Sequence, residues 1–176
     1  FFWVDFASLA PPTAATRQLL ELYRVHPLVT TGDADSYLFF AEALPFLLER
    51  VRSGLSERLA RGYVAPRELV ESAIAFHDGL RTLDMHDEPW LPSPTRLTAL
   101  DTVDQRAFTA ELQQTVRLRV MPALDSFVNW LHNDYLPQAS PTPGLWQYPG
   151  GKELYRHLLR RHTSLDVPPE EAHRVG

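Results

Sequence analysis

The chain has 176 residues, of which 44% are hydrophobic and 22% are charged, and its formal net charge is −5. This balance excludes wholesale disorder, and the negative charge argues against a dedicated nucleic-acid binder, whose domain is usually strongly basic. The length indicates one domain, or at most two very small ones. Because the chain has no cysteine, it has no disulfide framework, thiol nucleophile or cysteine-type zinc site. No apolar run approaches the roughly eighteen residues that a membrane span needs.

The first predicted helix follows an aromatic N-terminal stretch. Leu19, Leu22 and Tyr23 recur at helical spacing, and Pro27 ends the run. Thr13 is placed to cap the start of this helix.

A long second helix is predicted before Gly62. Asp33 or Asp35 is expected to cap its start. We expect Pro45 to kink or restart the helix, because proline removes a backbone donor and clashes with the preceding turn. Gly62 fits the left-handed position after the helix end. The apolar stripe of this helix consists of Leu44, Leu48, Val51, Leu55 and Leu59.

Two further helices flank a proline-rich loop at 84–94. The third helix has Pro66 in its first turn, and the fourth starts near Asp101 or Asp104 and is expected to bend at Pro122. The stripe of the third helix consists of Val70, Ala73, Ile74, His77 and either Leu80 or Arg81. The stripe of the fourth consists of Phe108, Leu112, Val116, Val120, Leu124, Phe127, Leu131 and Tyr135.

The C-terminal part contains a second proline-rich loop and two more predicted helices. Gly150 and Gly151 open a fifth helix, and a last short helix starts at Pro168 and Pro169 with acidic residues in its first turn. The apolar positions of the fifth helix are Leu154, Tyr155, Leu158 and Leu159. No strand pattern or internal repeat is visible. The sequence therefore predicts an all-α antiparallel bundle of about five to six helices with proline-rich loops.

The histidines form no recognisable metal motif, since none belongs to a His-Glu-x-x-His arrangement. His157 and His162 are five residues apart, which places them on different faces of a regular helix. We interpret Glu153 and His157 as a surface pair rather than metal ligands. The densest group of acidic and imidazole side chains has no known ligand spacing and is interpreted as a solvated loop, with a hard or borderline metal as the alternative. This group consists of His77, Asp78, Asp84, His86, Asp87 and Glu88.

A glycine pair and a basic helix end are the other candidate features. Gly150 and Gly151 lack the spacing of a phosphate-binding loop and are expected to form a tight turn, with Trp146, Tyr148 and Tyr155 around it. A loop of the preceding length is either functional or mobile. The cations at the end of the fifth helix complement the helix dipole, or alternatively grip a carboxylate or phosphate. These residues are Arg156, His157, Arg160, Arg161 and His162.

The C-terminal motifs carry a family resemblance. Residues 149–155 contain Gly-Gly followed by a helix with Tyr155, residues 158–163 contain Arg-Arg-His-Thr, and residues 166–176 contain Pro-Pro-Glu-Glu-Ala-His-Arg-Val-Gly. With similar segments at 33–70 and 120–137, the chain resembles a large bacterial family catalogued as domain of unknown function 885. Two positions depart from the family pattern, namely Leu154 and Ala172.

The resemblance implies that the full protein is a helical, metallopeptidase-like hydrolase of several hundred residues. Its presumed metal motif lies beyond this chain, so the resemblance assigns no catalytic residue and no metal ligand here, and it implies zinc in the full-length protein only. The region with Gly-Gly and Tyr155 is expected to lie near a substrate cleft. The candidate substrate-binding residues are Tyr148, Gly150, Gly151, Tyr155 and Arg160.

We therefore expect residues 1–176 to form a single helical domain or the N-terminal part of a larger helical protein. The chain begins with Phe1 rather than Met, which favours the second alternative. The expected partners are the missing C-terminal part and a peptide substrate, with no nucleic acid and no membrane-spanning segment. A cytoplasmic location is favoured, with secretion or envelope attachment left open. The alternative function is a non-catalytic helical module that binds a peptide or protein.

Overall fold

The computed structural model describes residues 6–11, 13–84, 86, 88–141, 144–164 and 167–175. All regular secondary structure within these residues is helical, which confirms the predicted all-α fold. The α-helices are α1 (Ala15–Val25), α2 (Thr31–Ala60), α3 (Arg67–Thr82), α4 (Thr102–Thr115), α5 (Met121–Trp130), α6 (Gly151–Thr163) and α7 (Pro169–Val175). Short 3-10 turns cover Pro94–Leu97, Leu136–Gln138 and Leu145–Gln147.

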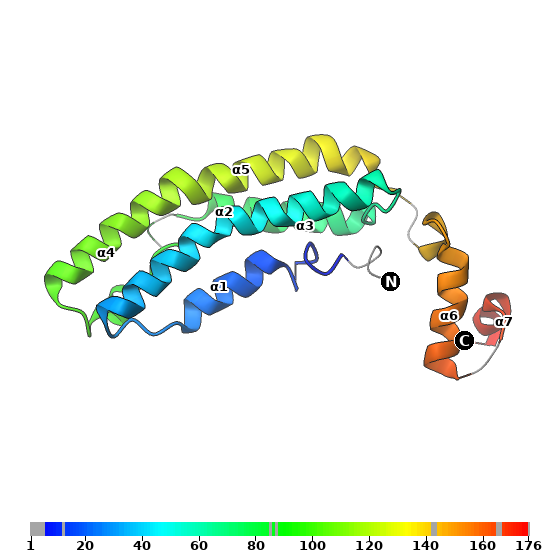
Figure 1. Ribbon diagram of the computed structural model, residues 1–176, viewed down its shortest axis with the longest axis horizontal. Coiled ribbons are helices and arrows are strands. Elements are labelled where there is room, and N and C mark those ends of the chain that lie inside the picture. Colours follow the sequence, from blue (N-terminus) through cyan, green and yellow to red (C-terminus); the bar gives the residue numbers. More distant parts are fainter. Residues whose placement is uncertain are drawn as a thin grey trace.

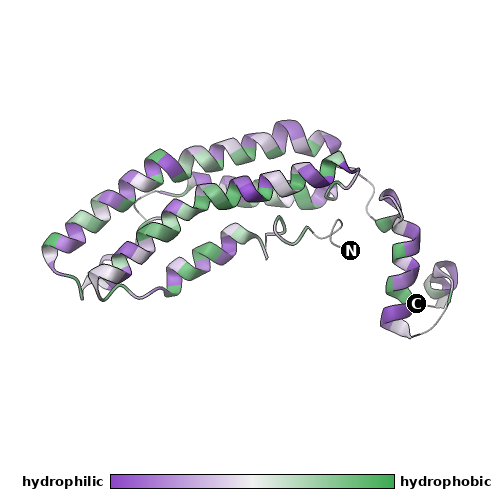
Figure 2. Cartoon of the chain, in the orientation of Figure 1, coloured by the Kyte–Doolittle hydropathy of each residue, from purple (hydrophilic) through white to green (hydrophobic). Residues whose placement is uncertain are grey.

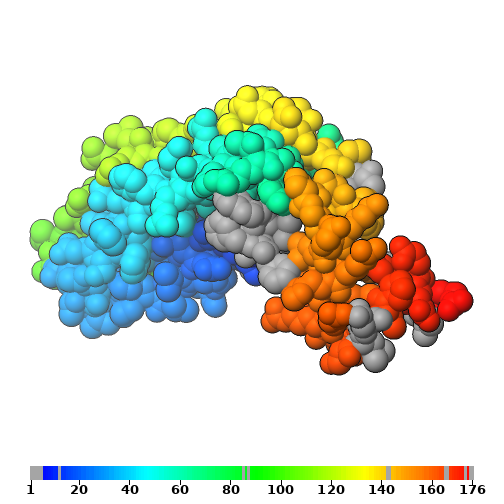
Figure 3. Space-filling view, turned by 45° about the vertical axis from the view of Figure 1, so that its right-hand side comes forward, coloured from blue at the N-terminus to red at the C-terminus, as the bar shows by residue number. Residues whose placement is uncertain are grey.

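The helices α1 to α5 form an elongated bundle in which α2 contacts α1, α4 and α5, and α3 contacts α5 (Figure 1). Short connections make α1, α2 and α3 run in alternating directions. By contrast, α6 and α7 lie beyond one end of the bundle and contact each other (Figure 1; Figure 3). None of the described helices has both the length and the apolar character to cross a bilayer.

The bundle core matches the predicted stripes closely. Every predicted stripe residue of the α4–α5 rod is buried, and so are the α3 stripe residues, with Leu80 rather than Arg81 facing inward. In α2, Leu44, Leu48 and Leu55 are buried, whereas Val51 and Leu59 are partly buried. Burial of apolar surface at this density supplies most of the free energy that holds a helical bundle together.

The start of α2 is capped by Thr30 rather than by Asp33 or Asp35. The Thr30 hydroxyl accepts from the backbone N–H of Asp33, and the Asp33 carboxylate accepts from the backbone N–H of Thr30 at 2.8 Å. This reciprocal capping box places Asp33 at the third helical position. Its hydrogen bonds, the largest from Thr30, hold the pKa of Asp33 below its usual value.

Two other helix-boundary expectations are corrected. The α2 helix is one element from Thr31 to Ala60, so it does not restart at Pro45, and Leu44 and Leu48 on either side of the proline are buried. The cap of α1 is Ala14, without a side-chain bond, because the Thr13 hydroxyl donates to the carbonyl of Ala7 instead. In α1, Leu22 is half exposed and lies outside the core.

Two π-helical turns shape the α4–α5 rod, which is continuous and curved (Figure 1). They cover Val116–Val120 and Leu131–Tyr135. Each π turn ends two residues before a proline, which is Pro122 in the first case and Pro137 in the second. A proline clashes with the carbonyl four residues earlier in an α-helix, and the wider turn takes up this clash. The predicted bend at Pro122 therefore occurs through a π turn rather than a break.

Candidate functional site

The glycine pair forms the entry to α6. Gly150 is left-handed, with φ 68°, and caps the helix. At Gly151 an added Cβ would lie 1.7 Å from the carbonyl oxygen of Leu145. Only glycine therefore lets the first residue of α6 approach the 3-10 turn Leu145–Gln147 this closely. The expected tight turn is present. Gly150 is required there for its left-handed backbone, and Gly151 for its close approach to Leu145.

Tyr148 is buried and anchors this turn to the bundle. Its hydroxyl donates to the carbonyl of Val64 at 2.8 Å, and its ring stacks on Tyr63 with centroids 5.8 Å apart. The Tyr63 hydroxyl in turn donates to the carbonyl of Pro149 at 3.2 Å. Burial raises the pKa of Tyr148 to about 12, so this phenol stays protonated at neutral pH. These contacts assign Tyr148 a positioning role for the turn.

Tyr155 lies half buried beside a pocket of about 260 Å³, which we call the turn pocket. Trp146 forms another wall and is 62% exposed. The pocket combines aromatic rings, aliphatic stems and charged groups of both signs, so it offers both apolar surface and polar partners. Its lining consists of Trp146, Gly151, Lys152, Tyr155, Arg156, Pro169 and Glu170.

Arg160 lies outside the lining of the turn pocket. It is exposed in the last turn of α6, together with Arg161 and His162. Positive charge in this position complements the negative end of the helix dipole. Of the predicted substrate-binding residues, Gly151 and Tyr155 therefore line the turn pocket, and Gly150 directly precedes Gly151. Tyr148 is buried, and Arg160 lies farther along α6, outside the pocket lining.

The described residues contain no group of three histidine, cysteine, aspartate or glutamate side chains that could hold a metal ion. His77 lies buried in α3, where its Nδ1–H donates to the carbonyl of Ala73 at 2.7 Å and its Nε2 accepts from the Thr16 hydroxyl at 3.1 Å. Burial lowers the pKa of His77, which keeps the imidazole neutral. Asp84 pairs with His86 in the exposed loop, and Asp87 lies outside the described residues.

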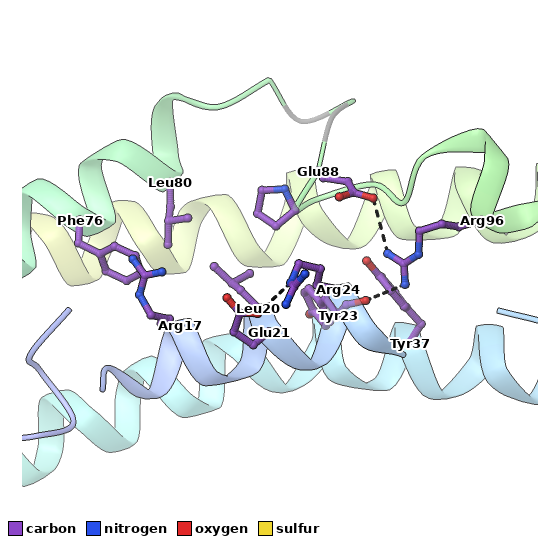
Figure 4. A pocket seen from close by; sticks show the side chains of 11 residues that line it. Arg17, Leu20, Glu21, Tyr23, Arg24, Tyr37, Phe76, Leu80, Glu88 and Arg96 are labelled. Carbon is purple, nitrogen blue, oxygen red and sulfur yellow. Dashed lines mark hydrogen bonds and ion pairs between the residues drawn. The ribbon is translucent and has the colours of Figure 1, made fainter. Parts of the chain in front are cut away.

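A second cavity, which the sequence pattern does not predict, lies between α1, α3 and the segment from 88 to 96 (Figure 4). We call it the α1–α3 pocket, and its volume is about 320 Å³. Its lining residues are Arg17, Leu20, Glu21, Tyr23, Arg24, Tyr37, Phe76, Leu80, Glu88, Pro89 and Arg96. The spacing of Arg17, Glu21 and Arg24 along one side of α1 was the available sequence signal.

Arg96 closes one end of the α1–α3 pocket. Its guanidinium donates to the carbonyls of Tyr23 and His26, at 2.8 and 2.9 Å, which lie at the end of α1. Glu88 lies 3.7 Å from the same guanidinium (Figure 4). Tyr23 and Tyr37 stack beneath it with centroids 4.8 Å apart, and burial raises the pKa of both phenols, to about 12 for Tyr37. Both tyrosines are therefore neutral at physiological pH.

A family model described as a bacterial protein of unknown function matches residues 4–176. No curated protein and no solved structure matches the chain significantly. Because the matched region spans nearly the whole chain, and the resemblance noted in its C-terminal motifs points the same way, the chain belongs to the family described as Bacterial protein of unknown function, DUF885.

Proposed function

We propose that this chain is the N-terminal helical part of a bacterial zinc metallopeptidase-like hydrolase, and that α6 and its glycine turn wall the peptide-binding cleft. The proposal builds on the family membership over residues 4–176 and on the metallopeptidase-like character that the resemblance implies. The observation that carries it is the turn pocket, where Tyr155 and Trp146 lie beside charged groups.

The chemistry of the turn pocket supports binding of a peptide segment. Tyr155 and the largely exposed Trp146 offer flat apolar surfaces to side chains. Lys152 and Arg156 supply donors for peptide carbonyls or a terminal carboxylate, while Glu170 supplies an acceptor. The described residues supply no set of zinc ligands. We therefore assign to this chain the binding and orientation of substrate rather than the bond-breaking step.

The experiment uses the full-length protein. We expect stoichiometric zinc by elemental analysis and zinc-dependent hydrolysis of a peptide library. Tyr155→Ala and Arg156→Gln, at two lining positions of the turn pocket, should each raise KM about tenfold or less while kcat stays within about twofold, because they remove binding contacts and no reacting group.

The matched control is Arg106→Gln, an exposed position on α4 far from α6. It should leave both kinetic constants unchanged. A full-length protein without zinc would reject the hydrolase assignment. Variants of the turn pocket with the kinetic constants of the control would reject the cleft assignment.

The second candidate is a non-catalytic helical module that binds a peptide or protein. The observation that favours it is an apolar patch on the outer face of α2, where Phe39 and Phe46 lie two turns apart and are each 67% exposed. Zinc content separates the two candidates: stoichiometric metal supports the hydrolase, and a functional metal-free preparation supports the binding module. Phe39→Ser with Phe46→Ser would then abolish partner binding without unfolding the bundle.

A further inference from the structure

The α1–α3 pocket has an apolar middle and two polar ends (Figure 4). Leu20 and Leu80 lie in the middle, while Arg17 beside Phe76 lies at one end and Arg96 with Tyr37 at the other (Figure 4). Pro89 also lines the pocket. A cavity of about 320 Å³ is at the lower end of the range seen for small-ligand sites. Its shape suits a short ligand with an apolar body.

Two of the three arginines that line the pocket pair with a carboxylate, and the third does not among the described residues. Arg24 pairs with Glu21 at 2.9 Å, and Arg96 is held by two carbonyls and by Glu88. Arg17 pairs with no carboxylate among the residues that the structure describes. The pocket therefore carries one uncompensated positive charge, and it lies at the Phe76 end.

The guanidinium of Arg17 is held in place by its own contacts. Its Nε donates to the carbonyl of Pro11 at 2.8 Å, and its Cζ lies 4.8 Å from the centroid of the Phe76 ring. Such a cation–π contact orients a guanidinium without using its terminal nitrogens. The two terminal nitrogens are thus available to grip a carboxylate in the bidentate manner typical of arginine.

We propose that the α1–α3 pocket binds a small carboxylic acid with an aromatic or branched apolar body. The carboxylate pairs with Arg17, and the body packs against Leu20, Leu80 and Pro89. This site lies within the bundle and away from the turn pocket, so it does not depend on the proposed hydrolase function.

The test titrates the whole chain with 3-phenylpropionate, followed by NMR shifts of α1 amides, and repeats the titration with the neutral 3-phenylpropanamide. We expect saturable binding of the acid and about fivefold weaker binding of the amide, since a partly exposed ion pair contributes up to about 1 kcal/mol. Arg17→Gln should reduce acid binding to the level of the amide.

The matched control Arg106→Gln should bind the acid as the wild type does, because Arg106 lies on the surface of α4. A second variant, Leu80→Trp, fills the middle of the pocket and should abolish binding of both probes while circular dichroism confirms an intact fold. Equal affinity for acid and amide, no saturable shift, or an Arg17→Gln variant that binds normally would each overturn the proposal.

Discussion

The α4–α5 rod and α6 carry similar amphipathic patterns but bury them to very different extents. All eight stripe positions of the rod are buried against the rest of the bundle. In α6, Leu154, Tyr155, Leu158 and Leu159 are only partly buried, although hydrophobic and hydrophilic side chains alternate along the helix (Figure 2). The difference lies in what surrounds each helix, because the main neighbours of α6 among the described residues are the 3-10 turn Leu145–Gln147 and the short α7. An apolar face stabilises a fold only to the extent that a neighbour covers it.

The largest expected effect tests this difference directly. Leu124→Ala removes a fully buried side chain from the rod and should lower the free energy of unfolding by about 2–5 kcal/mol. Leu158→Ala removes a half-buried side chain and should cost about 1 kcal/mol or less. Chemical denaturation of both variants gives the comparison. Equal losses would show that α6 is as integral to the folded unit as the rod.

Gly151→Ala sharpens the comparison by attacking only the attachment of α6. The added Cβ would collide with the carbonyl oxygen of Leu145, so we expect a cost of about 1–3 kcal/mol confined to the turn. Hydrogen exchange should speed up in α6 and remain unchanged in α2. The matched variant Gly150→Ala meets no atom within 4 Å and carries only left-handed strain of about 1 kcal/mol. Faster exchange throughout the bundle would contradict this local effect.

The smallest effect concerns a polar contact between α1 and α3. Thr16→Val removes the hydroxyl that donates to Nε2 of His77 and should lower the free energy of unfolding by about 1 kcal/mol, as chemical denaturation would measure.

Burial lowers the pKa of His77 in the folded state, so below its unfolded value near 6.5 the unfolded chain binds more protons. Stability should therefore fall as the pH drops below about 6.5.

Denaturation at a series of pH values measures this dependence. His77→Gln should flatten the acid side of the stability profile, whereas His132→Gln, at an exposed position, should leave its slope unchanged. A His77 variant with the same slope as the wild type would rule out the buried imidazole as its source.

Periodicity was sufficient to predict the bundle, because helical spacing dictates which side chains face a neighbour. The π turns also left a signal in the sequence. The rod stripe advances almost entirely in steps of four, which exceeds the α-helical period of about 3.6 and would wind around a regular helix. Wider turns at Val116–Val120 and Leu131–Tyr135 keep the stripe on one side. An interval of four that persists over several turns is therefore informative by itself.

Contacts between distant segments could not be predicted from spacing. The cap of α2 was predicted to be Asp33 or Asp35, and only the reciprocal bonds of the folded chain identify Thr30 in that position. The α1–α3 pocket depends on Arg96 reaching the end of α1 from 70 residues away or more. Tyr148 was predicted to bind substrate near the glycine turn, and its bond to Val64, 84 residues earlier, could not be predicted from spacing. The substrate-binding roles of Tyr155 and Arg160 remain predictions.

Two hydrogen bonds link the start of α6 to the bundle: the Tyr63 hydroxyl donates to the carbonyl of Pro149, and the Tyr148 hydroxyl donates to the carbonyl of Val64. They tie the base of α6 to the short connection between α2 and α3. A displacement of α6, as on binding of a molecule in the turn pocket, would therefore be transmitted through these two tyrosines. The connection between α2 and α3 is the first part of the bundle that such a displacement would reach.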